Sequence, residues 1–266
     1  MGDFVDLYDK IKKYYGFSKQ ELRSLIITII AVAFIISFDE WGTAEFNIAA
    51  GFFNLFNAIL ITAFSYLIKI SAQRIGALQI GYRCEHRMWS WGILLGIILA
   101  FVSNGSIWFL MTTSFIVHHM AGHRLGWFRY GINYFAIAMV ALWGPLANVL
   151  LVLFFKGLSG FISNPLIEKA ILLNALMAIY AMVPIPPMEG SKIYWGSRLA
   201  YVFSAVSIIL ASLLLIFIDI IWLAILTSFL LGLILWIVYY IYYERYAWSG
   251  PAGDSITATV GGRKVQ

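Results

Sequence analysis

Long apolar runs alternate with short polar segments along the chain, and their lengths predict membrane-crossing helices. The predicted crossings cover residues 25–38, 47–68, 134–155 and 166–183, and a 44-residue apolar run follows over residues 200–243. As a single helix, that last run would be about 66 Å long, roughly twice the hydrocarbon thickness of a bilayer. We therefore expect it to fold back at Asp219, its only charged residue, which gives six crossings in total.

One further apolar stretch, residues 91–117, is interrupted near its middle by Ser-Asn-Gly-Ser at positions 103–106. Each half is too short to span a bilayer, so the stretch predicts a re-entrant hairpin. Non-helical backbone at membrane depth must pack in protein or face a polar cavity, so the hairpin should help to wall a site.

Composition supports a membrane protein and excludes several other classes. Of the 266 residues, 62% are hydrophobic and only 12% are charged, about half the charged fraction of a soluble domain. The net charge of +5 is small and scattered, which argues against nucleic-acid binding. The single cysteine, Cys84, excludes an intramolecular disulfide. The predicted fold class is therefore an all-α polytopic membrane protein with six crossings and one re-entrant hairpin.

The distribution of charge predicts the orientation of the crossings. Acidic residues separate the first two crossings, whereas basic residues precede the first and follow the second, so the positive-inside rule places both termini in the cytoplasm. Of the 18 lysines and arginines, the six-crossing arrangement leaves only Lys156 and Lys169 outside; a hairpin that crossed fully would leave seven outside. The predicted localisation is the cell membrane.

Three regions follow from this pattern. Residues 1–23 form a cytoplasmic N-terminal segment with apolar residues at helical spacing among lysines, which fits either a helix on an anionic membrane surface or a frayed basic flank. Residues 24–248 form the membrane domain. Residues 249–266 are rich in Gly, Ser and Thr and predict a flexible tail.

Two motifs are more specific than the topology. Residues 143–148 read Trp-Gly-Pro-Leu-Ala-Asn inside a predicted crossing, and residues 183–193 read Val-Pro-Ile-Pro-Pro-Met-Glu-Gly-Ser-Lys-Ile at the end of the next one. Together they resemble the site-2 family of intramembrane zinc metalloproteases, and the resemblance covers about residues 45–200. The segments Ala-Gln-Arg at 72–74 and Glu-x-Arg-Met-Trp at 85–89 resemble the archaeal branch.

The resemblance implies a zinc site that this chain lacks in its usual form. In the family, His-Glu-x-x-His supplies two metal ligands and a general base, and an Asp in the second motif supplies the third ligand. Counted back from residue 72, that pentapeptide falls on residues 64–68, where the chain has Phe64, Ser65 and Ile68 in place of His, Glu and His. Glu189 stands at the third-ligand position, and no His-Glu-x-x-His occurs elsewhere. We therefore expect no metal and no other cofactor.

Histidines offer an alternative metal site. His119 and His123 are four residues apart, the spacing of a helical two-histidine site, and His118 and Glu189 could add ligands. Gly122 argues against a stable helix there, and interfacial histidines are usually solvated. Zinc is expected only under this alternative.

The remaining motif residues are candidates for a framework or a binding surface. Asn148 inside a crossing is costly unless paired, so we expect a hydrogen bond to unwound backbone near the proline-rich turn. The prolines of that turn end a helix and impose extended backbone, which either offers an edge to a peptide strand or is purely structural. The framework set is Gly144, Pro145, Asn148, Pro184, Pro186, Pro187 and Gly190.

The leading functional hypothesis is a catalytically inactive site-2-protease-like protein that binds a transmembrane partner or serves as a subunit of a membrane complex. This hypothesis rests on the observation that the framework motifs are present while the usual zinc ligands are not. The alternative is an active intramembrane zinc metalloprotease with non-standard ligands. A third hypothesis is a channel or carrier, against which stand the few ionisable residues at membrane depth and the lack of internal repeats.

Overall fold

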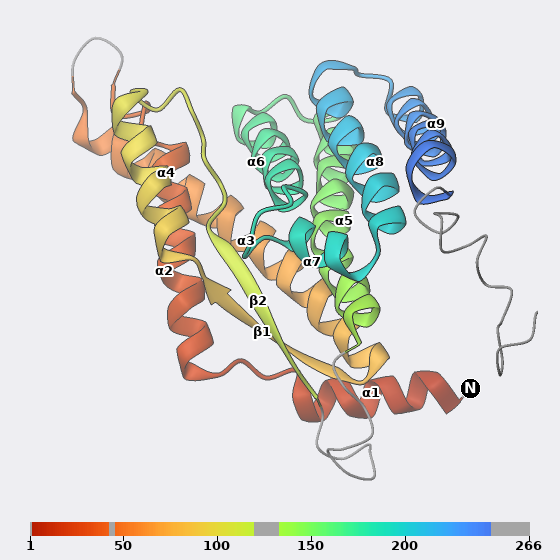
Figure 1. Cartoon of the computed structure of the whole chain (residues 1–266). Coiled ribbons are helices and arrows are strands. Elements are labelled where there is room, and N and C mark those ends of the chain that lie inside the picture. Colours follow the sequence, from red (N-terminus) through yellow and green to blue (C-terminus); the bar gives the residue numbers. More distant parts are fainter. Residues whose placement is uncertain (1, 43–45, 120–132, 246–266) are drawn as a thin grey trace, which may run out of the picture.

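A computed structural model describes residues 2–42, 46–119 and 133–245 of the chain (Figure 1). In chain order, its elements are α1 (Gly2–Tyr14), α2 (Lys19–Ile36), α3 (Ile48–Ile80), β1 (Tyr82–Met88), α4 (Ser90–Val102), β2 (Thr113–His119), α5 (Tyr134–Ser159), α6 (Pro165–Ala181), α7 (Glu189–Gly196), α8 (Arg198–Phe217), α9 (Ile221–Tyr239) and the π-helical turn η1 (Tyr240–Glu244). The predicted tail, residues 249–266, lies outside the described residues.

Each of the six predicted crossings coincides with a helix, namely α2, α3, α5, α6, α8 and α9. Among the described residues, α3, α5, α8 and the segment Ile221–Glu244 are long and apolar enough to cross a membrane. The other two helices are shorter or carry more charge near their ends. The predicted fold-back is confirmed, because α8 ends at Phe217 and α9 begins at Ile221 on either side of Asp219.

Two features differ from the predicted all-α fold. First, β1 and β2 form a two-stranded antiparallel sheet, with Tyr82 opposite His119 and Met88 opposite Thr113. Second, α3 does not end at residue 68 but continues to Ile80, so Lys69 and Arg74 lie on a buried helix face and not in a loop. The sequence predicted that the helix would end where these charged residues begin. They are instead buried within it, because acidic residues on other elements pair with them.

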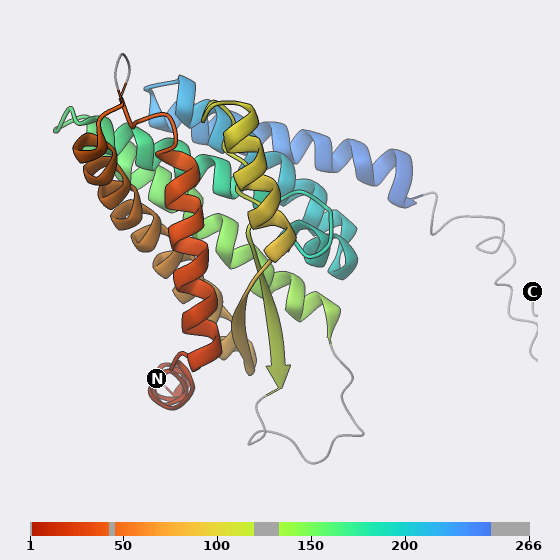
Figure 2. The same cartoon turned by 90° about the vertical axis from the view of Figure 1, so that its left-hand side faces the viewer.

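The predicted hairpin is a helix followed by extended chain. From the end of β1, the chain runs along α4, turns at residues 103–105 and returns as extended backbone to β2. Because Met88 pairs with Thr113, the two ends of this excursion lie side by side (Figures 1 and 2). Its returning limb lines the protein interior, where the Thr112 hydroxyl lies 2.7 Å from that of Tyr66. The membrane depth of the hairpin stays a prediction.

The helix α5 lies at the centre of the bundle and packs against α3, α6, α7 and α8. One core cluster joins α2, α3 and α6 around Ile36, Tyr66 and Leu173, and a second joins the sheet to α5 and α8 around Phe115 and Val140. Helix α9 packs on α8 and leaves most of its apolar side chains exposed, as expected for a surface that faces lipid.

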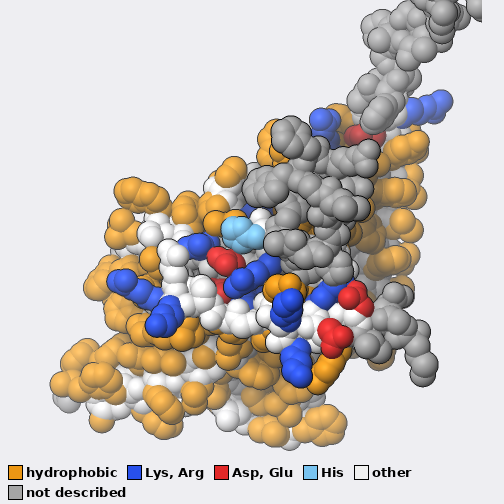
Figure 3. Space-filling model, turned by 90° about the horizontal axis from the view of Figure 1, so that it is seen from below, with side chains coloured by type: hydrophobic (Ala, Val, Ile, Leu, Met, Phe, Trp, Pro, Cys, Tyr) orange, Lys and Arg blue, Asp and Glu red, His pale blue; other side chains and the backbone are white. Residues whose placement is uncertain are grey.

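Charged side chains gather at the two ends of the bundle. Figure 3 shows Lys, Arg, Asp and Glu side chains together on the end seen from below, where α1 lies across the bundle (Figure 1). At the opposite end, Lys156 pairs with Asp219 at 3.0 Å, and Lys169 pairs with Glu40. Lys156 and Lys169 are the two cations that the six-crossing arrangement puts outside, and each contacts an acidic residue predicted on the same side.

Residues 2–14 are helical, not frayed, while contact of α1 with a membrane surface stays a prediction.

A buried ion pair ties the N-terminal segment to the core. Arg74 of α3 pairs with Glu21 of α2, and the same Glu21 carboxylate accepts a hydrogen bond from the backbone N–H of His86 at 2.8 Å. The guanidinium also donates to the backbone carbonyls of Tyr15 and Gly16. One arginine therefore connects α2, α3, β1 and the linker that follows α1.

We expect Glu21→Gln to destabilise the protein strongly, because it leaves the buried Arg74 guanidinium without a countercharge. The free energy of unfolding should fall by about 3–5 kcal/mol. Unfolding in detergent, followed by circular dichroism, measures this loss. Lys10→Gln removes the Lys10–Asp6 pair of α1, in which Asp6 is 53% exposed, and is the matched control, with an expected loss below about 1 kcal/mol. Equal losses in the two variants would contradict the assignment of the buried pair.

Candidate functional site

The site that the second motif marks is centred on the carboxylate of Glu189. This residue opens α7 and is only 2% exposed. Its Oε1 atom lies 2.8 Å from Nζ of Lys69, which is itself 4% exposed, and accepts a hydrogen bond from Nε2 of Gln73 at 3.3 Å. A carboxylate and an ammonium thus meet inside the bundle, between α3 and α7.

Local sequence explains why these elements meet. Prolines occupy positions 184, 186 and 187, where the chain between α6 and α7 is not helical, and α7 then starts at Glu189. A methyl group at Gly190 would lie 2.3 Å from the carbonyl oxygen of Met182, so only glycine permits this close return. A methyl group at Gly144 of α5 would lie 2.4 Å from Nε2 of Gln73. The two motif glycines therefore let α7 and α5 approach the ion pair.

The face of α3 that is buried beside Glu189 is not the face that carries Phe64 and Ile68. Ser65, Lys69 and Gln73 are spaced four apart on one helix face, and all three are buried. Phe64 and Ile68, which the sequence places at the ligand positions, are 44% and 39% exposed and lie on the outer face of α3. The side chains beside Glu189 are therefore not those that the count from residue 72 names, and the match of residues 64–68 to the family's ligand positions stays a prediction.

Electrostatics holds the central carboxylate in its charged form. Burial by itself raises the pKa of Glu189, but the Lys69 ammonium beside it outweighs burial and lowers that pKa below its ordinary value. A second cation, Lys192, donates hydrogen bonds to the Pro187 carbonyl at 2.8 Å and the Ser114 hydroxyl at 3.1 Å. Burial lowers the pKa of the Lys192 amine, and Glu189 partly offsets that effect.

The residues around Glu189 do not fit a zinc ion. Zinc in proteins is held by imidazole, thiolate and carboxylate groups, whereas α3 presents Ser65, Tyr66, Lys69 and Gln73 on this side. An ammonium has no lone pair to donate, and its positive charge opposes a cation. Among the described residues, no three His, Cys, Asp or Glu side chains are grouped as a metal site would need.

This geometry does not favour nucleophilic catalysis either. Ser65 and Lys69 are one helical turn apart, a spacing that could pair a serine nucleophile with a lysine base. However, the Lys69 amine is engaged by Glu189, and the Ser65 hydroxyl accepts a hydrogen bond from Nδ2 of Asn174 at 2.9 Å. Ser65 is also completely buried, so no substrate bond can reach it in this conformation.

The described residues cover the alternative metal site only in part. His118 is exposed at the end of β2, with Nε2 lying 3.8 Å from a carboxylate oxygen of Glu85. His119 belongs to the same strand, so the helical spacing to His123 does not begin there, and His123 itself lies outside the described residues. His86 is buried in β1, and burial together with the Lys69 charge lowers its pKa to about 4.

Buried asparagines were only partly anticipated. Asn148 is completely buried, and neither atom of its amide finds a hydrogen-bond partner in the described part of the chain, so the predicted bond to the proline-rich turn is not formed. That turn is held by Ser114 and Lys192 instead, through the Pro187 carbonyl. Sequence reasoning missed Asn174 and Lys69; a polar residue on the inward face of an apolar helix is the signal that could have found both.

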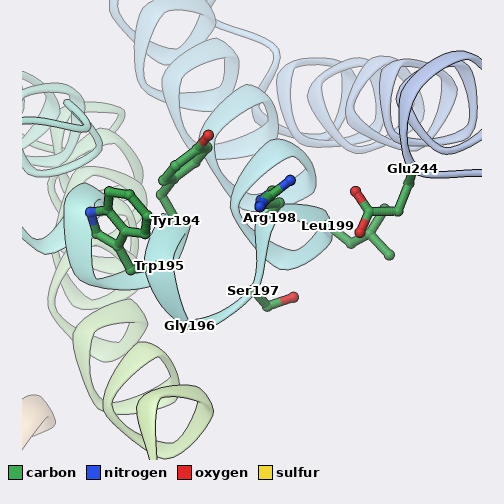
Figure 4. Close-up of a pocket in the computed structure, with 7 residues that line it drawn as sticks. All are labelled: Tyr194, Trp195, Gly196, Ser197, Arg198, Leu199 and Glu244. Carbon is green, nitrogen blue, oxygen red and sulfur yellow. The ribbon is translucent and has the colours of Figure 1, made fainter. Parts of the chain in front are cut away.

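A separate pocket of about 440 Å³ lies where α7 joins α8 (Figure 4). Its lining includes Trp195, Ser197 and Arg198 from that junction and Glu244 from the end of the last helix. None of the residues that the motifs single out for metal or catalysis lines it. The pocket is therefore distinct from the Glu189 centre.

Comparison with known proteins gives one distant relative. No family model matches the chain, and no solved structure matches it. A protein of Methanocaldococcus jannaschii named "Putative zinc metalloprotease" is 25% identical over 191 residues, which cover 67% of this chain and 85% of the relative. This similarity supports a distant relationship to a zinc metalloprotease and agrees with the resemblance of the two motifs. The four long apolar helices of the described residues support a membrane protein, and the relative supports a likeness to zinc metalloproteases.

We expect Lys69 and Glu189 to be strongly coupled. Lys69→Met alone leaves a buried carboxylate unpaired, and Glu189→Leu alone leaves a buried ammonium unpaired, so each should cost about 3–5 kcal/mol of unfolding free energy. The double variant removes both charges and should recover most of that loss. Unfolding in detergent of the four proteins in this cycle gives the coupling energy, and additive losses would show that the two groups do not interact.

Proposed function

We propose that this chain is a catalytically inactive, site-2-protease-like membrane protein in which the Lys69–Glu189 ion pair replaces a metal centre. The single observation that carries the proposal is the 2.8 Å contact between the Lys69 ammonium and the carboxylate at the third-ligand position. In this arrangement the lysine supplies the positive charge that a zinc ion would otherwise supply to that carboxylate. The position can therefore stay buried without metal.

The framework supports this interpretation. Gly144 and Gly190 still allow the close helix contacts, and the prolines still precede α7, while Ser65, Tyr66 and Lys69 face the centre where ligands and a base would be needed. Retained packing with lost donors is the pattern of a scaffold that has given up metal chemistry. A membrane scaffold without catalysis acts by binding, so we propose a transmembrane segment or another subunit of a membrane complex as its partner.

Metal content and proteolysis of the purified protein test the proposal directly. Protein prepared without a histidine tag should contain far less than one zinc per chain by elemental analysis and should not cut a helical membrane substrate in detergent. About one zinc per chain together with cleavage would overturn it in favour of a protease with non-standard ligands. Zinc-dependent cleavage that disappears in Glu189→Leu would locate those ligands at this centre.

A gain-of-binding experiment tests the position of the lost centre. The combined change Ser65→His, Tyr66→Glu, Lys69→His and Glu189→Asp builds a two-histidine, one-carboxylate set on the inward face of α3, so zinc binding should rise to about one ion per chain. The matched control moves the same motif one residue back, with Phe64→His, Ser65→Glu and Ile68→His beside Glu189→Asp. Its histidines point outward, so its zinc content should stay low. Zinc binding by the control alone would favour the register counted from the sequence.

A further inference from the structure

Four buried polar atoms lie between α3, α5 and α6 without a partner among the described residues. They are Oγ1 of Thr62, both amide atoms of Asn148, and Oδ1 of Asn174. All three residues are completely buried. Buried polar groups in native proteins are nearly always hydrogen-bonded to protein or to ordered water, and an unpaired one is destabilising. Such a concentration calls for a ligand that the protein side chains do not supply.

Known contacts place these groups around one spot. Asn174 of α6 donates to the Ser65 hydroxyl of α3 at 2.9 Å, and Thr62 lies one turn before Ser65 on the same face. On α5, Gly144 faces Lys69 and Gln73, while Val152 shares a core cluster with Ile171 and Ala175 of α6. Asn148 is one turn from each of these two positions, so it lies level with Ser65 and Asn174. Figures 1 and 2 show α3, α5 and α6 side by side.

We propose that ordered water molecules occupy an internal polar chamber bounded by Thr62, Ser65, Asn148 and Asn174. The chemistry of the unpaired atoms selects this ligand. The Asn148 amide nitrogen can only donate, the two amide oxygens can only accept, and the Thr62 hydroxyl can do both. A small neutral molecule that both donates and accepts satisfies all four atoms, which a metal ion or an apolar ligand cannot do.

The chamber goes beyond the proposed function, because it requires neither loss of catalysis nor a partner. It lies one helical turn along α3 from Lys69, so its water borders the central ion pair. Water beside a buried ammonium and carboxylate lowers the cost of keeping both charges inside the bundle. The ion pair and the asparagines are then parts of one hydrated interior.

Isosteric substitutions test the chamber through the sign of their effect. Thr62→Val keeps the shape of the side chain and removes only the hydroxyl. If water binds there, the variant loses hydrogen bonds and the midpoint of thermal unfolding should fall by about 2 °C or more. If the chamber is dry, the variant removes an unpaired polar atom and the midpoint should rise. An unchanged or raised midpoint overturns the proposal.

A second variant and a direct measurement keep the test decisive. Asn148→Leu should lower the midpoint further, and combining it with Thr62→Val should cost less than the sum because both changes disrupt the same water network. Asn57→Leu changes a half-buried position of α3, the helix that carries Thr62. It is the matched control and should change the midpoint little. A high-resolution structure of the full chain in lipid should show water density within hydrogen-bond distance of Asn148. Continuous side-chain packing without such density would overturn the proposal.

Discussion

The need to neutralise charge inside an apolar bundle governs this structure. An unpaired ion in such surroundings is very costly, and the two buried cations of α3 each have a carboxylate beside them. Lys69 meets Glu189 at the centre, and Arg74 meets Glu21 at the N-terminal end. Both cations lie on α3, five residues apart, and point to different neighbours. This one helix of 33 residues thereby connects α2, β1 and α7.

Under the proposed function, the same constraint explains how the scaffold can persist without a metal. A carboxylate at the third-ligand position needs a positive charge wherever it is buried, and a lysine on the facing helix supplies one. The lysine brings no Lewis acidity and no open coordination position, so under the proposed function the helix packing is kept without the metal chemistry. The relative named "Putative zinc metalloprotease" is 25% identical over the matched region, which fits a distantly related framework.

Hydrophobic pattern predicted the helices well and the site poorly. The six apolar runs and the turn at Asp219 followed from length and hydropathy, because burial in a bilayer imposes simple rules on both. The sheet was missed, because Tyr82–Met88 is short and mixed in polarity and draws its stability from pairing with a strand 25 residues further on. The buried polar face of α3 was not predicted for a related reason. A sequence count fixes spacing along a helix, but only the packing of Gly144 against Gln73 decides which face points inward.

The pairing of β1 with β2 has a topological consequence for the segment between them. Since Met88 and Thr113 are opposite each other, the segment from residue 89 to residue 112 begins and ends at the same place on the sheet. Such a closed excursion can lengthen or shorten at its tip without moving the strands, because the entropy of closing a loop changes slowly with its length. The tip around Asn104 is thus the place where evolution, or an engineer, can graft new sequence while the buried charges stay where they are.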